Sequence, residues 1–370
     1  MKHLSLLACA ITSSLLLSQS AFAEFDYFKT DDSFKRFSVS AGWLHAMPQG
    51  DPNPLQNSTS INDGTVAKNG SVKIKTVREV IDPDQSELTK LTVNTGLTLI
   101  GLASFRGEET DLSSTTFGDV SGDVEINGLE NWSSPGTGLK ADDADTVGLL
   151  FNYYLSDNWS VEFKAGIPPT VDILGEGQVF APLTGRVNAG GVGAILPEFD
   201  IKKDIPITDL TQGNGVASTA RAWLPAAGVQ YQFGKSGVNK FRPYVVAGAI
   251  YAYFDDIKLN EGIEQDLQRA GDQIQNIKDD KAGAALEDLK SSSDMTVEVD
   301  AESTLAPIIT LGATYDFNDR WFAVGSLSYA KLDSETTITV KNERGEELIK
   351  SKTNLDIDPY ITYLGLGYRF

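Results

Sequence analysis

The sequence predicts an all-β fold, an eight-stranded antiparallel transmembrane β-barrel with long extracellular loops. Three observations predict it: an export leader, apolar and polar residues that alternate with a period of two, and connections that are alternately long and short. A chain of 370 residues with 41% hydrophobic residues can bury a core as one large β-architecture. No later stretch approaches 18 uninterrupted apolar residues, so we expect no helical spans.

The leader occupies residues 1–23. A cationic start at Lys2 precedes an apolar run that ends at Leu17, and Ala21-Phe22-Ala23 supplies the small residues that a signal peptidase accepts. We therefore expect a cleaved signal peptide and a mature barrel at residues 24–370. Export through the periplasm to the outer membrane follows from this leader and the predicted barrel.

Charge and rare residues limit the chemistry of the chain. Its formal net charge of −20 argues against nucleic acid as a partner, because phosphates repel an acidic surface. Cys9 is the only cysteine, and His3 and His45 are the only histidines. We expect no disulfide framework, no metal site and no cofactor.

The eight expected strands are runs of alternating residues. In the C-terminal run, Tyr368 and Phe370 lie on the lipid side, where aromatic residues form a girdle at the membrane interface. We expect this ending to be the assembly signal that the barrel-assembly machinery binds. The expected strands are Phe37–Met47, Thr146–Leu155, Trp159–Ile167, Trp223–Phe233, Phe241–Phe254, Leu305–Phe317, Trp321–Leu332 and Asn354–Phe370.

Connection lengths predict the orientation. The segments 156–158, 234–240 and 318–320 are short, as periplasmic turns are in outer-membrane barrels. Between them lie the long connections, which we expect to be extracellular loops and which span 48–143, 171–220, 255–303 and 333–353.

Several motifs carry a family resemblance. The segments Phe241-Arg-Pro-Tyr-Val-Val-Ala-Gly-Ala-Ile-Tyr, Gly148–Ala165 and Leu355-Asp-Ile-Asp-Pro-Tyr resemble strands of the OmpW/AlkL family of small outer-membrane channels. This resemblance covers the eight strands but not the segment Pro48–Asp143. It implies a setting of outer-membrane lipid and lipopolysaccharide, and passive uptake of small, mainly hydrophobic solutes.

Inward positions then define the expected channel. An eight-stranded barrel encloses a lumen that side chains nearly fill, so a wide porin is excluded. The expected lumen-lining residues are Leu44, Leu150, Tyr154, Val246, Ile250, Ile361 and Tyr363. Charges expected to pair across the periplasmic side of the lumen are Glu162, Lys164, Arg242 and Arg369. Prolines remove donors from the wall and mark an expected lateral opening at Pro168, Pro169 and Pro225.

The long connections contain further patterns. The β-prone runs 72–81 and 88–105 predict an external hairpin, with two additional barrel strands as the alternative. Segment 261–290 has helical apolar spacing and predicts a helix on the loop side of the barrel. Asp142, Asp143 and Asp145 offer oxygen ligands for Ca²⁺, although a solvated charge run explains them better.

Two other functional classes remain open from the sequence. The long acidic loops also suit a structural or interaction protein that binds surface or host partners. An enzyme would have to use His45 as its base, and an interfacial role suits this histidine better. We therefore expect no enzyme.

Overall fold

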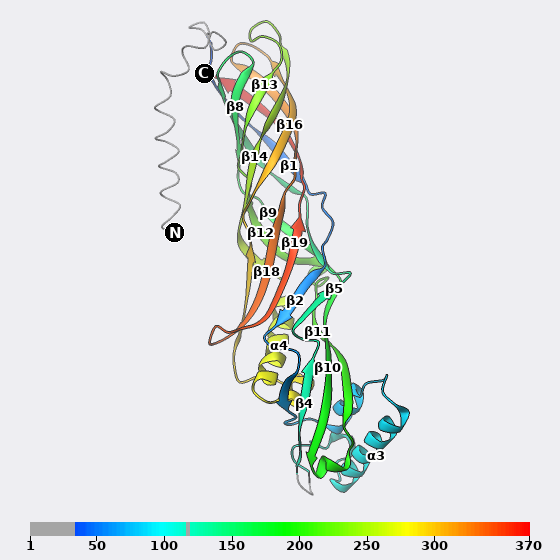
Figure 1. Ribbon diagram of the computed structural model, residues 1–370. Helices are drawn as coiled ribbons and strands as arrows, with labels where there is room; N and C mark the ends of the chain where they lie inside the picture. Colours follow the sequence, from blue (N-terminus) through cyan, green and yellow to red (C-terminus); the bar gives the residue numbers. More distant parts are fainter. Residues whose placement is uncertain (1–33, 116–118) are drawn as a thin grey trace.

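The protein is built around a closed antiparallel barrel at one end of an elongated molecule (Figure 1). The computed structural model describes residues 34–115 and 119–370, so the expected leader lies outside the described residues. The ring closes because β20 pairs with β1 and β13 pairs with β14. The predicted eight-stranded barrel is confirmed. Its strands are β1 (Phe37–Met47), β7 (Ala144–Tyr154), β8 (Trp159–Gly166), β13 (Ala226–Gln232), β14 (Phe241–Leu259), β16 (Thr304–Asp316), β17 (Trp321–Ala330) and β20 (Tyr360–Arg369).

Outward side chains of the barrel form an apolar band between two aromatic belts. Exposed apolar residues of the band include Val147, Val229, Leu311, Leu327 and Leu364. Aromatic pairs near the short turns include Trp159 with Tyr231 and Trp321 with Tyr368, and the pair Tyr329–Tyr360 lies near the opposite end. This arrangement is that of a barrel surrounded by lipid. Among the described residues, no helix combines the length and the apolar character needed to cross a bilayer.

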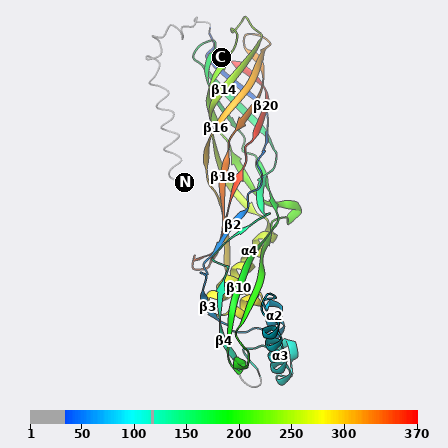
Figure 2. The same ribbon diagram turned by 45° about the vertical axis from the view of Figure 1, so that its right-hand side comes forward.

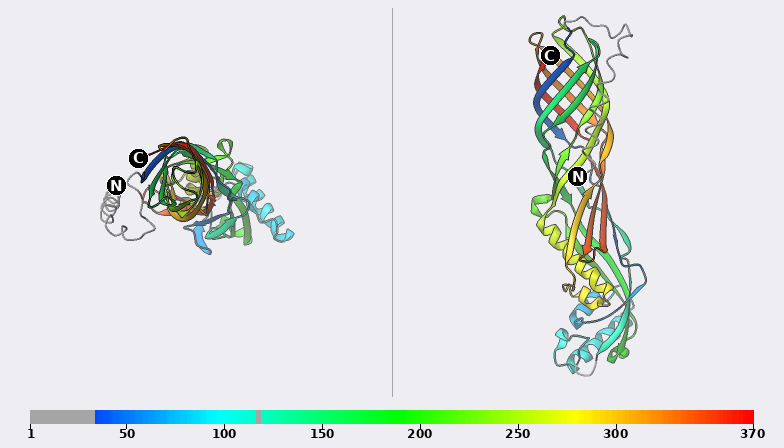
Figure 3. Two further views of the ribbon diagram at one scale, coloured as in Figure 1. Left: turned by 90° about the horizontal axis from the view of Figure 1, so that it is seen from above. Right: turned by 90° about the vertical axis from the view of Figure 1, so that its left-hand side faces the viewer.

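The β-structure continues well beyond this band (Figure 3). Strand β14 has 19 residues, and at about 3.4 Å per residue it is about 65 Å long, twice the hydrocarbon thickness of a bilayer. Beyond the barrel, one wall joins β14 to β12 (Val216–Trp223), β9 (Thr170–Glu176) and β6 (Gly138–Ala141). The facing sheet has the order β15-β18-β19-β2-β5. We call these two walls the extension. The strands of the facing sheet are β15 (Met295–Ala301), β18 (Asp333–Asn342), β19 (Glu347–Asp356), β2 (Leu55–Thr59) and β5 (Asn131–Ser134).

A third sheet and several helices form the far end of the molecule, which we call the distal part (Figure 2). Its sheet has the order β11-β10-β4-β3. Helices α2 and α3 pack beside this sheet. The bounds are β3 (Thr65–Lys68), α2 (Ile74–Val80), α3 (Glu87–Ala103), η2 (Gly107–Glu109), β4 (Val120–Asn127), β10 (Gln178–Gly191), η3 (Val192–Ile195) and β11 (Phe199–Asp209). The short helix η4 (Gly213–Gly215) follows β11 and contacts β9 of the extension.

The prediction of β-structure at 72–105 is wrong. Helices α2 and α3 occupy this segment, which forms neither an external hairpin nor two barrel strands. Helical spacing is present in α3, whose buried positions are Val93, Gly96, Leu97, Ile100 and Gly101. Threonines favour strands on intrinsic propensity, so the segment resembles β-structure in sequence. In the helix, the hydroxyls of Thr92, Thr95 and Thr98 donate to the carbonyls four residues earlier, so each hydroxyl finds an acceptor within the helix.

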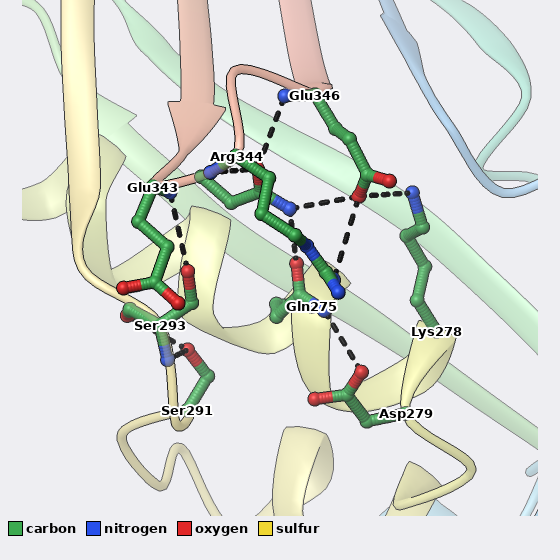
Figure 4. A network of polar contacts seen from close by, with 9 residues as sticks. Gln275, Lys278, Asp279, Ser291, Ser293, Glu343, Arg344 and Glu346 are labelled. Atoms are coloured by element: carbon green, nitrogen blue, oxygen red, sulfur yellow. Dashed lines mark hydrogen bonds and ion pairs between the residues drawn. The ribbon is translucent and has the colours of Figure 1, made fainter.

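The helix expected within 261–290 is present as α4 (Glu261–Lys278) and α5 (Ala282–Leu286). Helix α4 contacts β11, β15 and β18, so its apolar side joins the distal part to the extension. A polar network fixes its C-terminal end to the turn between β18 and β19 (Figure 4): the Asn342 amide donates to Gln275 at 3.0 Å, and Lys278 pairs with Glu346 at 3.3 Å. The Asn342 amide, and then Lys278, lower the pKa of Glu346 from its usual value.

Candidate functional site: an apolar cavity beside a break in the wall

A cavity of about 280 Å³ lies where the barrel meets the extension, and we call it the junction cavity. Residues from both walls of the extension line it, together with the adjoining end of the barrel. Asp142 and Lys164 are the charged residues among the described side chains of the lining. Most of the remaining lining is apolar and includes Leu139, Ile173, Trp223, Phe254, Leu332 and Ile357. Such a concave, largely apolar site with few polar groups is typical of small-molecule binding.

The barrel wall is interrupted beside this cavity. Pairing of β8 with β13 ends at Lys164 and Ala226, and pairing of β9 with β12 begins at Thr170 and Arg221. Between them, the amide of Ala222 donates to the carbonyl of Pro169 at 3.0 Å, the one backbone hydrogen bond found there among the described residues.

We call the segments 165–169 and 222–225 the wall gap. Pro168, Pro169 and Pro225 lie in it and have no N–H to donate, so the ladder cannot continue regularly. All three prolines also line the junction cavity. The gap and the cavity therefore adjoin, at the position where the sequence predicts a lateral opening.

A packed cluster lies next to the cavity on the side of the short turns. Its members are Leu150, Tyr244, Val246, Phe322, Val324 and Tyr363, and the half-buried Leu44 packs against it. Glycines make room for its rings: a Cβ at Gly367 would lie 2.2 Å from the Phe322 ring, and one at Gly312 would lie 2.4 Å from that of Tyr244. The Tyr363 hydroxyl shares a hydrogen bond of 3.0 Å with Ser40.

The expected lumen-lining residues thus separate into different environments. Leu44 lines the junction cavity, whereas Leu150, Val246 and Tyr363 belong to the packed cluster. Ile250 and Ile361 are buried in the main hydrophobic core, and Tyr154 is buried with an edge-on contact to Phe34. Their role in conduction stays a prediction.

The four expected lumen charges are all buried, but they do not pair with one another at ion-pair distance within the described residues. Arg369 pairs instead with Asp316 at 2.8 Å and lies 4.4 Å over the Phe322 ring. Arg242 donates to the backbone carbonyls of Asp157, Phe233 and Gly234. Sequence reasoning missed Asp316, since it stands at the end of a strand where an acidic residue is normally solvated.

Lys164 and Glu162 lie on the inner face of β8. The Lys164 ammonium donates to the Ser328 hydroxyl at 3.0 Å. Glu162 is near enough for an electrostatic interaction with Lys164 and leaves its Oε2 atom buried without a hydrogen bond. Lys164 lines the junction cavity, and Glu162 lies two residues nearer the short turns.

His45 lies at the rim of the barrel in a local polar contact. Its Nδ1 atom is 2.9 Å from Asp145, whose carboxylate also accepts from the indole N–H of Trp43 at 2.7 Å. Asp142 lines the cavity, and its carboxylate accepts from the amide of Asp143. Among the described residues, no group of three or more histidine, cysteine or acidic side chains is arranged to hold a metal ion.

The C-terminal aromatic residues lie in the belt near the short turns. Tyr368 packs against Trp321 at 5.1 Å and against Phe370 at 5.0 Å between ring centres. The amide of Phe370 donates to the carbonyl of Phe37, which closes the last part of the ring. Recognition of this end by an assembly machinery stays a prediction.

Most of the cavity lining was missed from the sequence. Residues such as Leu139, Ile173 and Val299 lie in connections expected to be loops. The apolar alternation of β14 beyond Phe254 was a usable sign that the walls extend past the membrane.

Comparison with known proteins gives one sequence relative and several similar structures. The chain is 29% identical over 224 residues to outer membrane protein W of Vibrio cholerae, a match that covers 60% of this chain and 73% of the relative. No protein-family model matches the chain.

Two solved structures align with most of the chain. The crystal structure of OprG from Pseudomonas aeruginosa aligns with a TM-score of 0.44 at 14% identity, and covers 91% of this chain and 96% of that one. The solid-state NMR structure of AlkL in DMPC bilayers aligns with a TM-score of 0.37 at 14% identity, and covers 92% and 94%.

Proposed function

We propose that this outer-membrane protein, which is similar in sequence to outer membrane protein W, is a channel for passive uptake of small, mainly hydrophobic molecules. In this proposal the solute occupies the junction cavity and leaves sideways into the membrane through the wall gap. The long connections face the outside, and both ends of the chain face the periplasm, as in other barrels of this kind.

The observation that carries this proposal is the meeting of an apolar cavity with an interrupted wall. The lining of the junction cavity includes residues 165–169 on one edge of the gap and 222–225 on the other. On the side of the short turns, the packed cluster around Tyr363 fills the barrel. A solute in the cavity therefore meets less protein in the direction of the gap than along the barrel axis.

Closing the gap tests the proposal. Replacing Pro168 and Pro169 by threonine restores two backbone donors and favours a continuous ladder. Uptake of a labelled alkane into proteoliposomes should slow for this double variant. Pro307→Thr is the matched control, because Pro307 is an exposed proline of β16 that does not line the cavity. An unchanged rate in the correctly folded double variant would refute exit through the wall, and no uptake by the natural protein would refute the channel.

A second candidate function rests on the distal part. Helix α3 presents Leu88, Leu91, Leu99 and Leu102 to solvent, with exposed fractions of 57% or more. Exposed apolar stripes of this kind mark interaction surfaces. The alternative is therefore a structural or interaction protein that binds a surface or host partner through the distal part.

Polar substitution of the stripe separates the two candidates. Replacing the four leucines by glutamine leaves the buried side of α3 and the junction cavity unchanged. A channel keeps its uptake rate in this variant. Loss of binding to a second cell surface, with uptake retained, would assign an interaction role to the distal part.

A further inference from the structure

The barrel interior contains an excess of buried positive charge. Five charged side chains are buried among the described residues: the cations Lys164, Arg242 and Arg369, and the anions Glu162 and Asp316. Arg369 pairs with Asp316. Arg242 lies near Asp157 and Asp316. Glu162 is the buried carboxylate that interacts with Lys164, but it does not reach ion-pair distance, so this ammonium can accept one further anionic partner. Buried charges are costly unless they are compensated.

Lys164 is the buried cation that a solute can reach. It is 4% exposed, yet it lines the junction cavity. An ammonium can donate three hydrogen bonds, and within the described residues its Nζ atom makes one, to the Ser328 hydroxyl at 3.0 Å. Ser328 in turn shares a hydrogen bond of 2.7 Å with Thr310. No carboxylate among the described residues lies within ion-pair distance of Lys164.

The neighbouring acid does not occupy the cavity side of this ammonium. Glu162 precedes Lys164 by two residues on the same face of β8 and lies nearer the short turns. The other charged lining residue, Asp142, is exposed and comes from the connection that precedes β7. An acceptor that enters the cavity from the wall gap therefore approaches Lys164 on the side that Glu162 leaves open.

We propose that the junction cavity takes amphipathic acids, with the carboxylate held by Lys164 and the hydrocarbon tail lying along the apolar lining. A carboxylate accepts a charge-assisted hydrogen bond from the buried Lys164 ammonium. A neutral hydrocarbon offers no acceptor and leaves this donor unsatisfied. This inference rests on the proposed function and specifies its solute class.

The cavity volume limits the length of the tail. A cavity of about 150 Å³ lined by Leu, Ile and Phe binds benzene, with six non-hydrogen atoms. In proportion, the 280 Å³ of the junction cavity holds about eleven or twelve such atoms. Decanoic acid has this size, and 1-decanol and decane are neutral molecules of similar length.

Equilibrium binding of these three labelled probes tests the inference. Purified protein in lipid nanodiscs is compared with protein-free discs, so that partition into lipid is subtracted. Decanoate should bind about tenfold tighter than 1-decanol, which corresponds to one additional charge-assisted hydrogen bond. Lys164→Met should reduce decanoate affinity to that of 1-decanol, and Lys164→Arg should retain most of the preference. Lys258→Met is the matched control, because this lysine is largely exposed and pairs with Asp256 outside the cavity.

Each result is decisive. Equal affinities of the natural protein for decanoate and 1-decanol, or a preference that persists in Lys164→Met, would overturn the role of Lys164 while leaving an apolar cavity in place. Absence of binding by all three probes would overturn the proposed function itself. Heat-modifiable migration on gels reports folding, and if Lys164→Met does not fold, the natural protein and Lys164→Arg still decide the preference.

Discussion

Filling the junction cavity with one aromatic ring should abolish its use by chain-like solutes. Ala220 lines the cavity from β12 and is buried. Ala220→Phe adds a phenyl ring, which needs about the 150 Å³ that benzene occupies in an engineered cavity. About 130 Å³ of the 280 Å³ then remains, enough for about five non-hydrogen atoms.

The loss of affinity follows from the displaced chain. A ten-carbon solute would keep about half of its carbons in the cavity, and each lost CH₂ contact is worth about 0.8 kcal/mol. Five displaced groups amount to about 4 kcal/mol, or roughly a thousandfold in affinity. Benzene should lose much less affinity than decane, since the remaining space is only slightly smaller than the volume that one ring needs.

Binding of decane and benzene to the protein in nanodiscs, and decane uptake into proteoliposomes, measure these effects. Ala227→Phe is the control, because Ala227 is exposed on β13 and the same ring would point toward lipid. Decane binding at natural affinity in Ala220→Phe would refute the assignment of the cavity. Equal losses in both variants would show that the ring disturbs the barrel instead of filling the site.

Three further predictions concern stability. Arg369→Met should lower the free energy of unfolding of the barrel in urea by about 3–5 kcal/mol, because it leaves Asp316 buried without its partner. Adding Asp316→Leu should recover most of this loss. A double variant that is no more stable than Arg369→Met alone would contradict the mechanism. Gly367→Val should prevent formation of the heat-modifiable form, since its Cβ meets the Phe322 ring, and Phe322→Ala in the same chain should partly restore it. Ser86→Ala should cost about 1 kcal/mol in the stability of α3, measured by hydrogen exchange, because Ser86 accepts from the amide of Thr89 at its N-terminus.

The barrel was predictable because each of its strands has a lipid side and an inner side. In the C-terminal strand, Leu364 and Leu366 face outward while Tyr363 and Arg369 are buried, as the period of two requires. The short turns then fix which strands are neighbours. An even number of such strands allows β1 to pair antiparallel with β20, and this pairing closes the barrel.

Local pattern was insufficient for the distal part. In α3 the threonines favour a strand on propensity, whereas burial of Val93, Leu97 and Ile100 against the sheet favours a helix, and packing prevails. The residue that compensates Arg369 was not predictable either. Asp316 stands 53 positions before it, and only the register of the closed barrel brings the two together.

The position of the cavity follows from a difference in the size of the inward side chains between the barrel and the junction. In the barrel, inward side chains as large as Tyr244, Phe322 and Tyr363 fill the lumen. At the junction, smaller inward residues such as Ala144, Ala220 and Ala222 line the space, while the prolines of the wall gap prevent the strands from closing over it. A void lined by small side chains beside an interrupted ladder costs stability. An apolar solute that binds there restores the lost contacts. Because this stabilisation depends on how well the solute fits, we expect the junction cavity, and not the packed barrel below it, to determine which solutes the channel accepts.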